Sequence, residues 1–337
     1  MSRTFDVLEW TIAAARGDSY PDFPEHPQIT VYDTGVIAIE PEQGSSKDVI
    51  LSCAVHGDET APIELVRDMI HAVLDGTLKI RQRVLFMIAN PWSIVAGKRF
   101  VEVNMNRLFS GAHATGDTLE HQHAAKLERY VERFYTSAPA GQRQRYHYDL
   151  HTAIRDSAYE KFAVYPFRHG QPYKREQLTF LAECGVSTIL LNQAPTTTFS
   201  YFSSHQFGAD AFTVELGKVR PFGQNDMSRF AAADHMFRQL ISTETLELPE
   251  FDASRHHIFD VCRTIDRTQT EFRLNFPDDV ANFTPFSQGE LLAVDGTTEY
   301  HVEQAQERII FPNANVAIGQ RALLTVTELP VAELDLV

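Results

Sequence analysis

The sequence predicts an α/β protein, with a carboxypeptidase-like three-layer arrangement of helices around a mostly parallel or mixed sheet and a small β-rich C-terminal domain. Apolar runs typical of strands alternate with helical patterns up to about residue 241, which favours a sheet covered on both faces. The runs are nearly continuous, as expected for strands buried on both sides. After Pro249 only short β-type segments remain. We therefore expect one domain over residues 1–247 and a second over 248–337.

The first half of the chain gives these elements in order. Apolar residues at helical spacing from Phe5 to Ala15 predict a helix that ends at Gly17. Asp33-Thr34-Gly35 separates two β-type runs and is typical of a hairpin turn. The expected elements are a helix over 5–15, hairpin strands over 29–32 and 36–39, buried strands over 49–55 and 84–90, and helices over 61–74 and 119–134.

The second half continues the alternation and then changes character. One strand is expected to end at His151 and another at Glu215, and no helix of useful length is expected after residue 249. The remaining elements are strands over 162–165 and 188–191, helices over 178–184 and 227–241, and C-terminal strands over 257–261, 290–294, 308–311 and 322–326.

Residues suited to metal binding and proton transfer follow three of the predicted strands. His56 and Glu59 come directly after the run 49–55, and His151 and Glu215 end their own strands. Open α/β sheets place their sites at the carboxyl ends of strands, where these side chains are expected to meet. Two histidines and one glutamate form a ligand set of catalytic zinc that leaves a position for water. We expect one Zn²⁺ per chain, with Glu215 as the base that takes a proton from water and passes it to the departing nitrogen.

Each of these residues has a plainer interpretation when it is taken alone. Acids after His56 also favour a helix N-terminus, and Glu215 also suits a salt bridge with Lys218 or Arg220. Asp149, two residues before His151, suits either a hydrogen bond that orients the histidine or a solvated strand end. The shared position of the residues at strand ends is what favours a metal site.

A basic segment indicates what the site binds. Residues 98–109 hold Arg99, Asn106 and Arg107 in a chain that is otherwise acidic. Arginine binds carboxylates through two parallel hydrogen bonds, and an asparagine can fix a remaining oxygen. The alternative is a surface loop with ordinary ion pairs. Arg155, Lys218 and Arg220 lie near predicted strand ends and are further candidates for a positive pocket.

Composition limits the class of partner. The net charge of −15 and the pI near 5.4 argue against nucleic-acid binding, because such proteins present basic faces. The N-terminal sequence does not resemble a signal peptide, and no apolar run reaches membrane-spanning length, so no membrane partner is expected. Three scattered cysteines, each expected to be buried, fit a reducing compartment, and we expect a cytoplasmic protein. No pattern indicates an oligomeric state.

Several segments together carry a resemblance to a known family. They are His56-Gly57-Asp58-Glu59-Thr60-Ala61-Pro62, Gly97-Lys98-Arg99 through Asn106-Arg107, Asp149-Leu150-His151-Thr152-Ala153-Ile154-Arg155, Glu215-Leu216-Gly217-Lys218, residues 221–226, and shorter matches at 275–276 and 311–313. In these segments the chain resembles the succinylglutamate desuccinylase family, in the aspartoacylase branch of the zinc carboxypeptidase-like enzymes.

The resemblance implies hydrolysis of N-succinyl-L-glutamate to succinate and L-glutamate, the last step of arginine breakdown by the succinyltransferase route. It implies zinc ligands at His56, Glu59 and His151 and an acid/base at Glu215. It also implies that the carboxylates of a small tricarboxylate substrate are bound by Arg99, Asn106 and Arg107.

One position departs from the pattern of the relatives. They often have an arginine about ten residues before the catalytic glutamate, where this chain has His205, and we expect His205 to take a weaker, pH-dependent version of that role. A deacylase for another N-acyl amino acid, such as N-acetylaspartate, or a carboxypeptidase stays open as an alternative. A metal-free protein that binds an acidic metabolite is a further alternative, which the presence of all four site residues disfavours.

Overall fold

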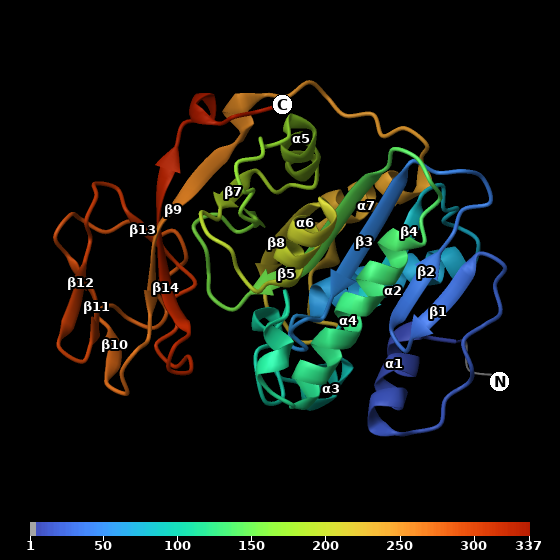
Figure 1. Ribbon diagram of the computed structural model, residues 1–337, viewed down its shortest axis with the longest axis horizontal. Helices are drawn as coiled ribbons and strands as arrows, with labels where there is room; N and C mark the ends of the chain where they lie inside the picture. Colours follow the sequence, from blue (N-terminus) through green and yellow to red (C-terminus); the bar gives the residue numbers. More distant parts are fainter. Residues whose placement is uncertain (1–4) are drawn as a thin grey trace.

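The computed structural model describes residues 5–337, in which an eleven-stranded mixed sheet runs through the molecule (Figure 1). The strand order is β1-β2-β4-β3-β5-β8-β6-β7-β9-β14-β13. The strands are β1 Ile29–Asp33, β2 Val36–Ile39, β3 Lys47–Cys53, β4 Arg83–Ile88, β5 Gln144–Ala153, β6 Phe162–Tyr165, β7 Thr188–Leu191, β8 Asp210–Lys218, β9 His257–Asp266, β10 Phe272–Leu274, β11 Leu291–Asp295, β12 Thr298–His301, β13 Arg308–Ile310 and β14 Arg321–Leu329.

Helices cover both faces of this sheet, as the fold class requires. They are α1 Val7–Arg16, α2 Thr60–Leu74, α3 Pro91–Ala96, α4 Leu119–Thr136, α5 Arg175–Glu183, α6 Phe199–Phe207 and α7 Ala231–Ser242, with short 3-10 turns that include η1 Met105–Arg107. Alternate residues of a strand face opposite sides. Val49 and Leu51 of β3 accordingly join the core under α2, α5 and α7, whereas Ile50 joins the core under α4 and α6. The predicted layers are confirmed.

Three parallel strands at the centre of the sheet position the site. Strand β5 pairs in parallel with β3 on one side and with β8 on the other, so all three end at the same edge. The pairing places His151 directly opposite Glu215, and a bulge follows at once. Gly217, with φ 143°, allows the backbone conformation at this bulge, a feature common where a strand bends next to a site.

The C-terminal part of the chain continues the main sheet. Strand β9 pairs in parallel with β7 and antiparallel with β14, so hydrogen bonds cross the proposed boundary at residue 248. Beyond them lies a separate antiparallel sheet of β10, β11 and β12, which shares a smaller apolar core with β14. We retain the division into residues 1–247 and 248–337 as a proposal, in which the two parts share one sheet.

Some local features differ from the sequence predictions. Helix α6 and strands β10 and β12 were not predicted, and Cys262 is exposed, whereas Cys53 and Cys184 are buried as expected. Cys262 lies on β9 in a stretch where it and Thr264 are exposed, whereas Val261 and Arg263 are half-buried. None of the helices in residues 5–337 combines the length and the apolar character needed to cross a bilayer.

Candidate metal centre

The carboxylate of Glu59 lies between the imidazoles of His56 and His151. Its Oε1 is 2.8 Å from His56 Nδ1, and its Oε2 is 2.9 Å from His151 Nδ1. All three side chains are almost fully buried, and one ligand atom from each lies within 4.8 Å of the others. Sequence prediction therefore chose three residues that the fold brings together.

Local backbone geometry brings the first two ligands into place. Strand β3 ends at Cys53, and Ala54 adopts a left-handed conformation with φ 58°, which turns the chain out of the sheet. Gly57 then passes close to α3, because a Cβ at this position would lie 2.2 Å from the backbone of Ser93. Glu59 stands at the N-cap of α2, yet its side chain does not cap the helix. Its carboxylate is therefore available to the site.

The outer nitrogens of both imidazoles are held by hydrogen bonds. Nε2 of His56 is 3.0 Å from Asn104 Oδ1, and Nε2 of His151 is 2.8 Å from Asp149 Oδ2. Because these partners are acceptors, each Nε2 carries the hydrogen and donates it. The lone pairs of both Nδ1 atoms then point toward Glu59, an arrangement that needs a positive charge between them. Metal-binding histidines are commonly fixed in this way by partners of the second nitrogen.

The charge states follow from burial and from these neighbours. Burial, with repulsion from Arg99, lowers the pKa of His56 to about 4, so this ring is neutral. Burial alone would lower the pKa of His151 too, but Asp149 and Glu59 raise it well above its usual value. Burial would raise the pKa of Glu59, whereas the two imidazoles hold it well below its usual range. Glu59 and His151 therefore form a buried ion pair, whose donor atoms surround the position that a metal ion would take.

These residues fit a divalent metal on the chemistry of their donor atoms. Two imidazole nitrogens and a carboxylate oxygen make a three-ligand set, which leaves a place for water or substrate. The site is buried, its ligands are oriented by Asn104 and Asp149, and it opens to a cavity. The group His56, Glu59 and His151 can therefore hold a metal ion.

Glu215 lies beside the triad on the neighbouring strand. Its side chain faces the same cavity, and its Oε2 is buried without a hydrogen-bond partner in residues 5–337. Burial, with repulsion from Glu59, raises the pKa of Glu215 to about 7. A carboxylate with such a pKa exchanges protons readily near neutral pH.

A cavity of about 780 Å³ is lined by His56, His151 and Glu215. Arg99, Asn106 and Arg107 line it, as predicted. Arg99 donates a 2.6 Å hydrogen bond to Glu59, and Asn106 uses its Oδ1 to accept from Phe199 N at the start of α6, which leaves the Asn106 NH₂ group for other partners. Arg107 donates to the backbone oxygen of Asn106. The basic segment is therefore part of the site.

Four other predicted residues, His205, Arg155, Lys218 and Arg220, do not line this cavity. His205 is exposed in the last turn of α6, where it stacks on Tyr201 and His169, and it does not line the cavity. The expected contact of His205 with substrate has no support in this geometry, because the helix carries the residue away from the strand ends. Arg155, Lys218 and Arg220 line a separate cavity of about 600 Å³, and Lys218 pairs there with Asp156. Arg155 also lines a smaller cavity, of about 260 Å³, together with Arg107 and Glu215.

Sequence reasoning missed several residues of the site. Asn104 lies within the basic segment 98–109, and its side chain accepts a hydrogen bond from His56. Asp149 also accepts from Ser52, which contacts His147, and these two residues extend the buried hydrogen-bond chain behind the metal centre. Arg321 reaches the cavity from the C-terminal part of the chain. Only Asn104 had a signal in the sequence, namely its place beside Asn106 and Arg107.

Fold and site together define an α/β/α protein with a candidate metal centre at the carboxyl edge of its sheet. The chain belongs to the succinylglutamate desuccinylase/aspartoacylase family, whose catalytic-domain model matches residues 45–241. The model of the AstE/AspA barrel-sandwich hybrid domain matches residues 254–329. The family resemblance and the fold class predicted from the sequence are thereby confirmed.

Full-length relatives agree with this assignment. The chain is 57% identical to a succinylglutamate desuccinylase of Idiomarina loihiensis over the whole of both chains, and 52% identical to one of Shewanella piezotolerans over 99% of each. Among solved structures, the succinylglutamate desuccinylase of Chromobacterium violaceum superposes with a TM-score of 0.83 at 38% identity, over 96% of this chain and 98% of the other.

Proposed function

We propose that this protein hydrolyses the amide bond of N-succinyl-L-glutamate, giving succinate and L-glutamate. The observation that carries the proposal is the convergence of the His56–Glu59–His151 group, Glu215 and an arginine-lined cavity on one sheet edge. Relatives that carry the name succinylglutamate desuccinylase over the full length of the chain support the choice of substrate.

In this proposal His56, Glu59 and His151 hold one Zn²⁺. Zinc in such a ligand set lowers the pKa of water and polarises a carbonyl. The ion would take the place of the hydrogen bonds that join Glu59 to His56 and His151. Asn104 and Asp149 keep both imidazoles oriented and keep their hydrogens on Nε2, so that the Nδ1 lone pairs remain available.

Glu215 is proposed to move the proton. Glu215 lines the cavity, and its Oε2 has no hydrogen-bond partner within residues 5–337, so its carboxylate can accept a proton from the attacking water. The same proton then passes to the amide nitrogen as the bond to the acyl carbon breaks. A pKa near 7 suits both steps, because the group gains and loses a proton with little cost near neutral pH.

The cavity residues are proposed to bind and orient the tricarboxylate. Arg107 and Arg99 offer donor pairs to carboxylates, and the NH₂ group of Asn106 adds a donor. An acidic protein that gathers arginines at one cavity selects for anions there. We further propose a cytoplasmic role in arginine breakdown, consistent with the chemistry of the substrate.

The test is hydrolysis of a panel of N-acyl amino acids by metal-stripped protein, with and without added zinc. We expect zinc to restore activity, with N-succinyl-L-glutamate preferred over N-acetyl-L-aspartate and N-acetyl-L-glutamate. Preference for an acetylated substrate would replace the proposal with another deacylase. Tight binding of these compounds without hydrolysis in zinc-loaded protein would favour a binding protein.

A further inference from the structure

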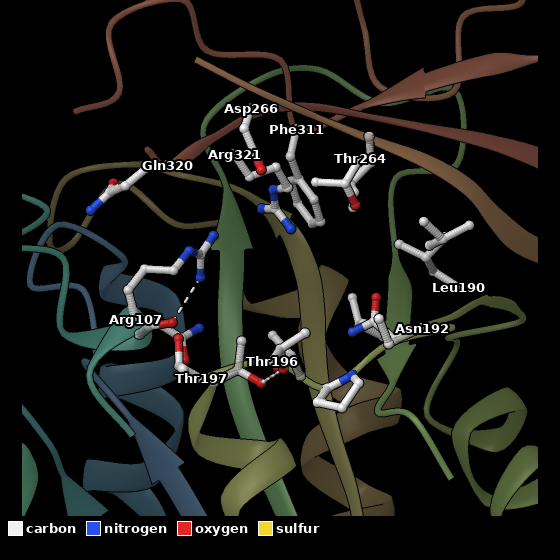
Figure 2. A pocket seen from close by; sticks show the side chains of 18 of the residues that line it. Arg107, Leu190, Asn192, Thr196, Thr197, Thr264, Asp266, Phe311, Gln320 and Arg321 are labelled. Atoms are coloured by element: carbon white, nitrogen blue, oxygen red, sulfur yellow. Dashed lines mark hydrogen bonds between the residues drawn. The ribbon is translucent and has the colours of Figure 1, made fainter. Parts of the chain in front are cut away.

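The cavity has a wall from the C-terminal part of the chain, and Arg321 stands in that wall. Arg321 is the first residue of β14 and lines the cavity together with Glu215. Figure 2 shows the guanidinium groups of Arg107 and Arg321 entering the cavity from opposite sides. The guanidinium of Arg321 lies 5.3 Å from the ring centre of Phe311, which limits the directions it can take.

The charge of Arg321 is not neutralised where it lies. Its Nε is buried and has no hydrogen-bond partner within residues 5–337. Asp266, its partner in the β9–β14 register, is the acid that favours its charge, yet the two form no ion pair. Burial first, and then repulsion from Arg99, lowers the pKa of Arg321 to about 10. Arginine stays protonated at that pKa, so the cavity holds a cation that lacks an anion.

The other arginines at this cavity have partners or lie on the opposite side. Arg99 is paired with Glu59, and Arg263 is paired with Glu303 and Glu307. Arg107 contacts a backbone oxygen, and burial together with Arg321 lowers its pKa well below the usual value. Two cations that repel each other across a cavity are stabilised by an anion that lies between them or contacts both.

We propose that Arg321 binds one carboxylate of the substrate and thereby makes the C-terminal part of the chain a determinant of specificity. This inference rests on the proposed function, since N-succinyl-L-glutamate carries three carboxylates. Arg99 and Arg107 come from the first domain, and His205 lies outside the cavity. Arg321 supplies the additional anion contact that His205 does not.

The experiment compares R321Q and R321K with the unmodified chain on N-succinyl-L-glutamate and three analogues. Each analogue replaces one carboxylate with a neutral amide: N-succinamoyl-L-glutamate, N-succinyl-L-glutamine and N-succinyl-L-isoglutamine. We expect R321Q to lower kcat/KM on the tricarboxylate by about 30-fold or more, as for a lost buried charge contact, and R321K to recover part of the loss. On one analogue the effect of R321Q should fall to about threefold or less, since the carboxylate it serves is already absent.

The matched control is R308Q, which removes an arginine that packs over Phe259 in the same region and does not line the cavity. R308Q should leave kcat/KM unchanged. Zinc content and the thermal midpoint are measured for every variant, so that a misfolded protein is recognised. Full activity in R321Q, or an equal loss on all four substrates, would overturn the role of Arg321.

A binding measurement separates this proposal from the proposed function. In zinc-loaded E215Q protein, calorimetry gives the Kd of N-succinyl-L-glutamate with and without R321Q. We expect Kd to rise by about 30-fold in the double variant. An unchanged Kd overturns the Arg321 contact. Absence of hydrolysis by the unmodified chain would instead overturn the proposed function, and the Kd comparison would still decide the role of Arg321.

Discussion

The two ends of the central strands differ in whether their buried charged side chains are paired. At the amino end of β3, Asp48 is fully buried and accepts hydrogen bonds from Arg83 at 2.8 Å and Arg143 at 2.7 Å, and Arg83 also binds Glu40. At the carboxyl end, within residues 5–337, Glu215 has an oxygen without a hydrogen-bond partner and Arg321 forms no ion pair.

This difference distinguishes charged side chains that stabilise the fold from charged side chains that are free to bind a ligand. Buried charges are normally paired, because an unpaired one is costly. Asp48 meets this rule, and so does Glu59, which is bound by Arg99 and by both imidazoles. Within residues 5–337, Glu215 and Arg321 do not meet it. Burial alone would not distinguish Asp48 from Glu215, since both are almost inaccessible. The number and kind of their partners do.

The largest effect on activity should come from removing Glu215, the proposed proton carrier at the carboxyl end of the strands. We expect E215Q to lower kcat by about 10²- to 10⁴-fold, the usual contribution of a general base. Zinc content should stay at one ion per chain, because Glu215 is not part of the His56–Glu59–His151 group. Steady-state kinetics and elemental analysis give the two quantities. Normal turnover in E215Q would remove Glu215 from the mechanism, and the matched H151A variant should lose both metal and activity.

Removing a buried charge at the amino end of β3 should lower the stability of the fold. D48N leaves Arg143 without its carboxylate, and we expect a loss of about 3–5 kcal/mol in the free energy of unfolding, as for one partner removed from a buried ion pair. Urea denaturation measures this value. D234N, which breaks the exposed pair with Arg238 on α7, is the control and should cost about 0.5 kcal/mol or less. Equal losses in the two variants would contradict the contrast between the ends.

The partners of the outer imidazole nitrogens should set metal affinity. N104A removes the acceptor of His56 Nε2, and we expect zinc to bind about 10- to 100-fold more weakly. Competition with a chromophoric chelator measures this affinity. S45A, a variant at the paired end where Ser45 accepts from Arg143, should bind zinc normally. Unchanged affinity in N104A would show that Asn104 does not orient the ligand.

The smallest effect is a pH dependence of metal binding. His151 has a raised pKa and is protonated at neutral pH, so a metal must displace its proton, whereas His56 is already neutral. Lowering the pH therefore weakens binding, by about tenfold for each pH unit when one proton is released. Chelator competition between about pH 6 and pH 8 measures the slope. A flat profile would show that no proton is exchanged for the metal.

Sequence patterns predicted the strand ends that form the site, because an apolar run followed by a polar residue is a local feature of the sequence. An apolar run that stops at His56, His151 or Glu215 predicts both a strand and the residue at which the strand ends. Parallel pairing then brings these strand ends together. The fold class followed from the same alternation. The supporting residues Ser52 and His147 were not predicted, since polar residues inside apolar strands have no pattern that identifies their partners.

Long-range packing and weak helical signals account for the other misses. Helix α6 contains several serines and aromatic residues of modest helix propensity and lacks a clear apolar stripe. It is stabilised at its start by caps from Thr198 and Asn106. Its direction decides that His205 lies outside the cavity. Arg321 is brought in by the β9–β14 pairing, more than two hundred residues after Arg107 in sequence.

The hydrogen bonds between β7 and β9 also bear on what happens if the chain is cut. Removing residues 248–337 would uncover the row of amide and carbonyl groups along β7 that now pair with β9. An uncovered strand of this kind recruits strands from other molecules and promotes aggregation. By covering the edge of β7, residues 248–337 protect residues 1–247 from self-association, and this effect does not depend on any contact with ligand.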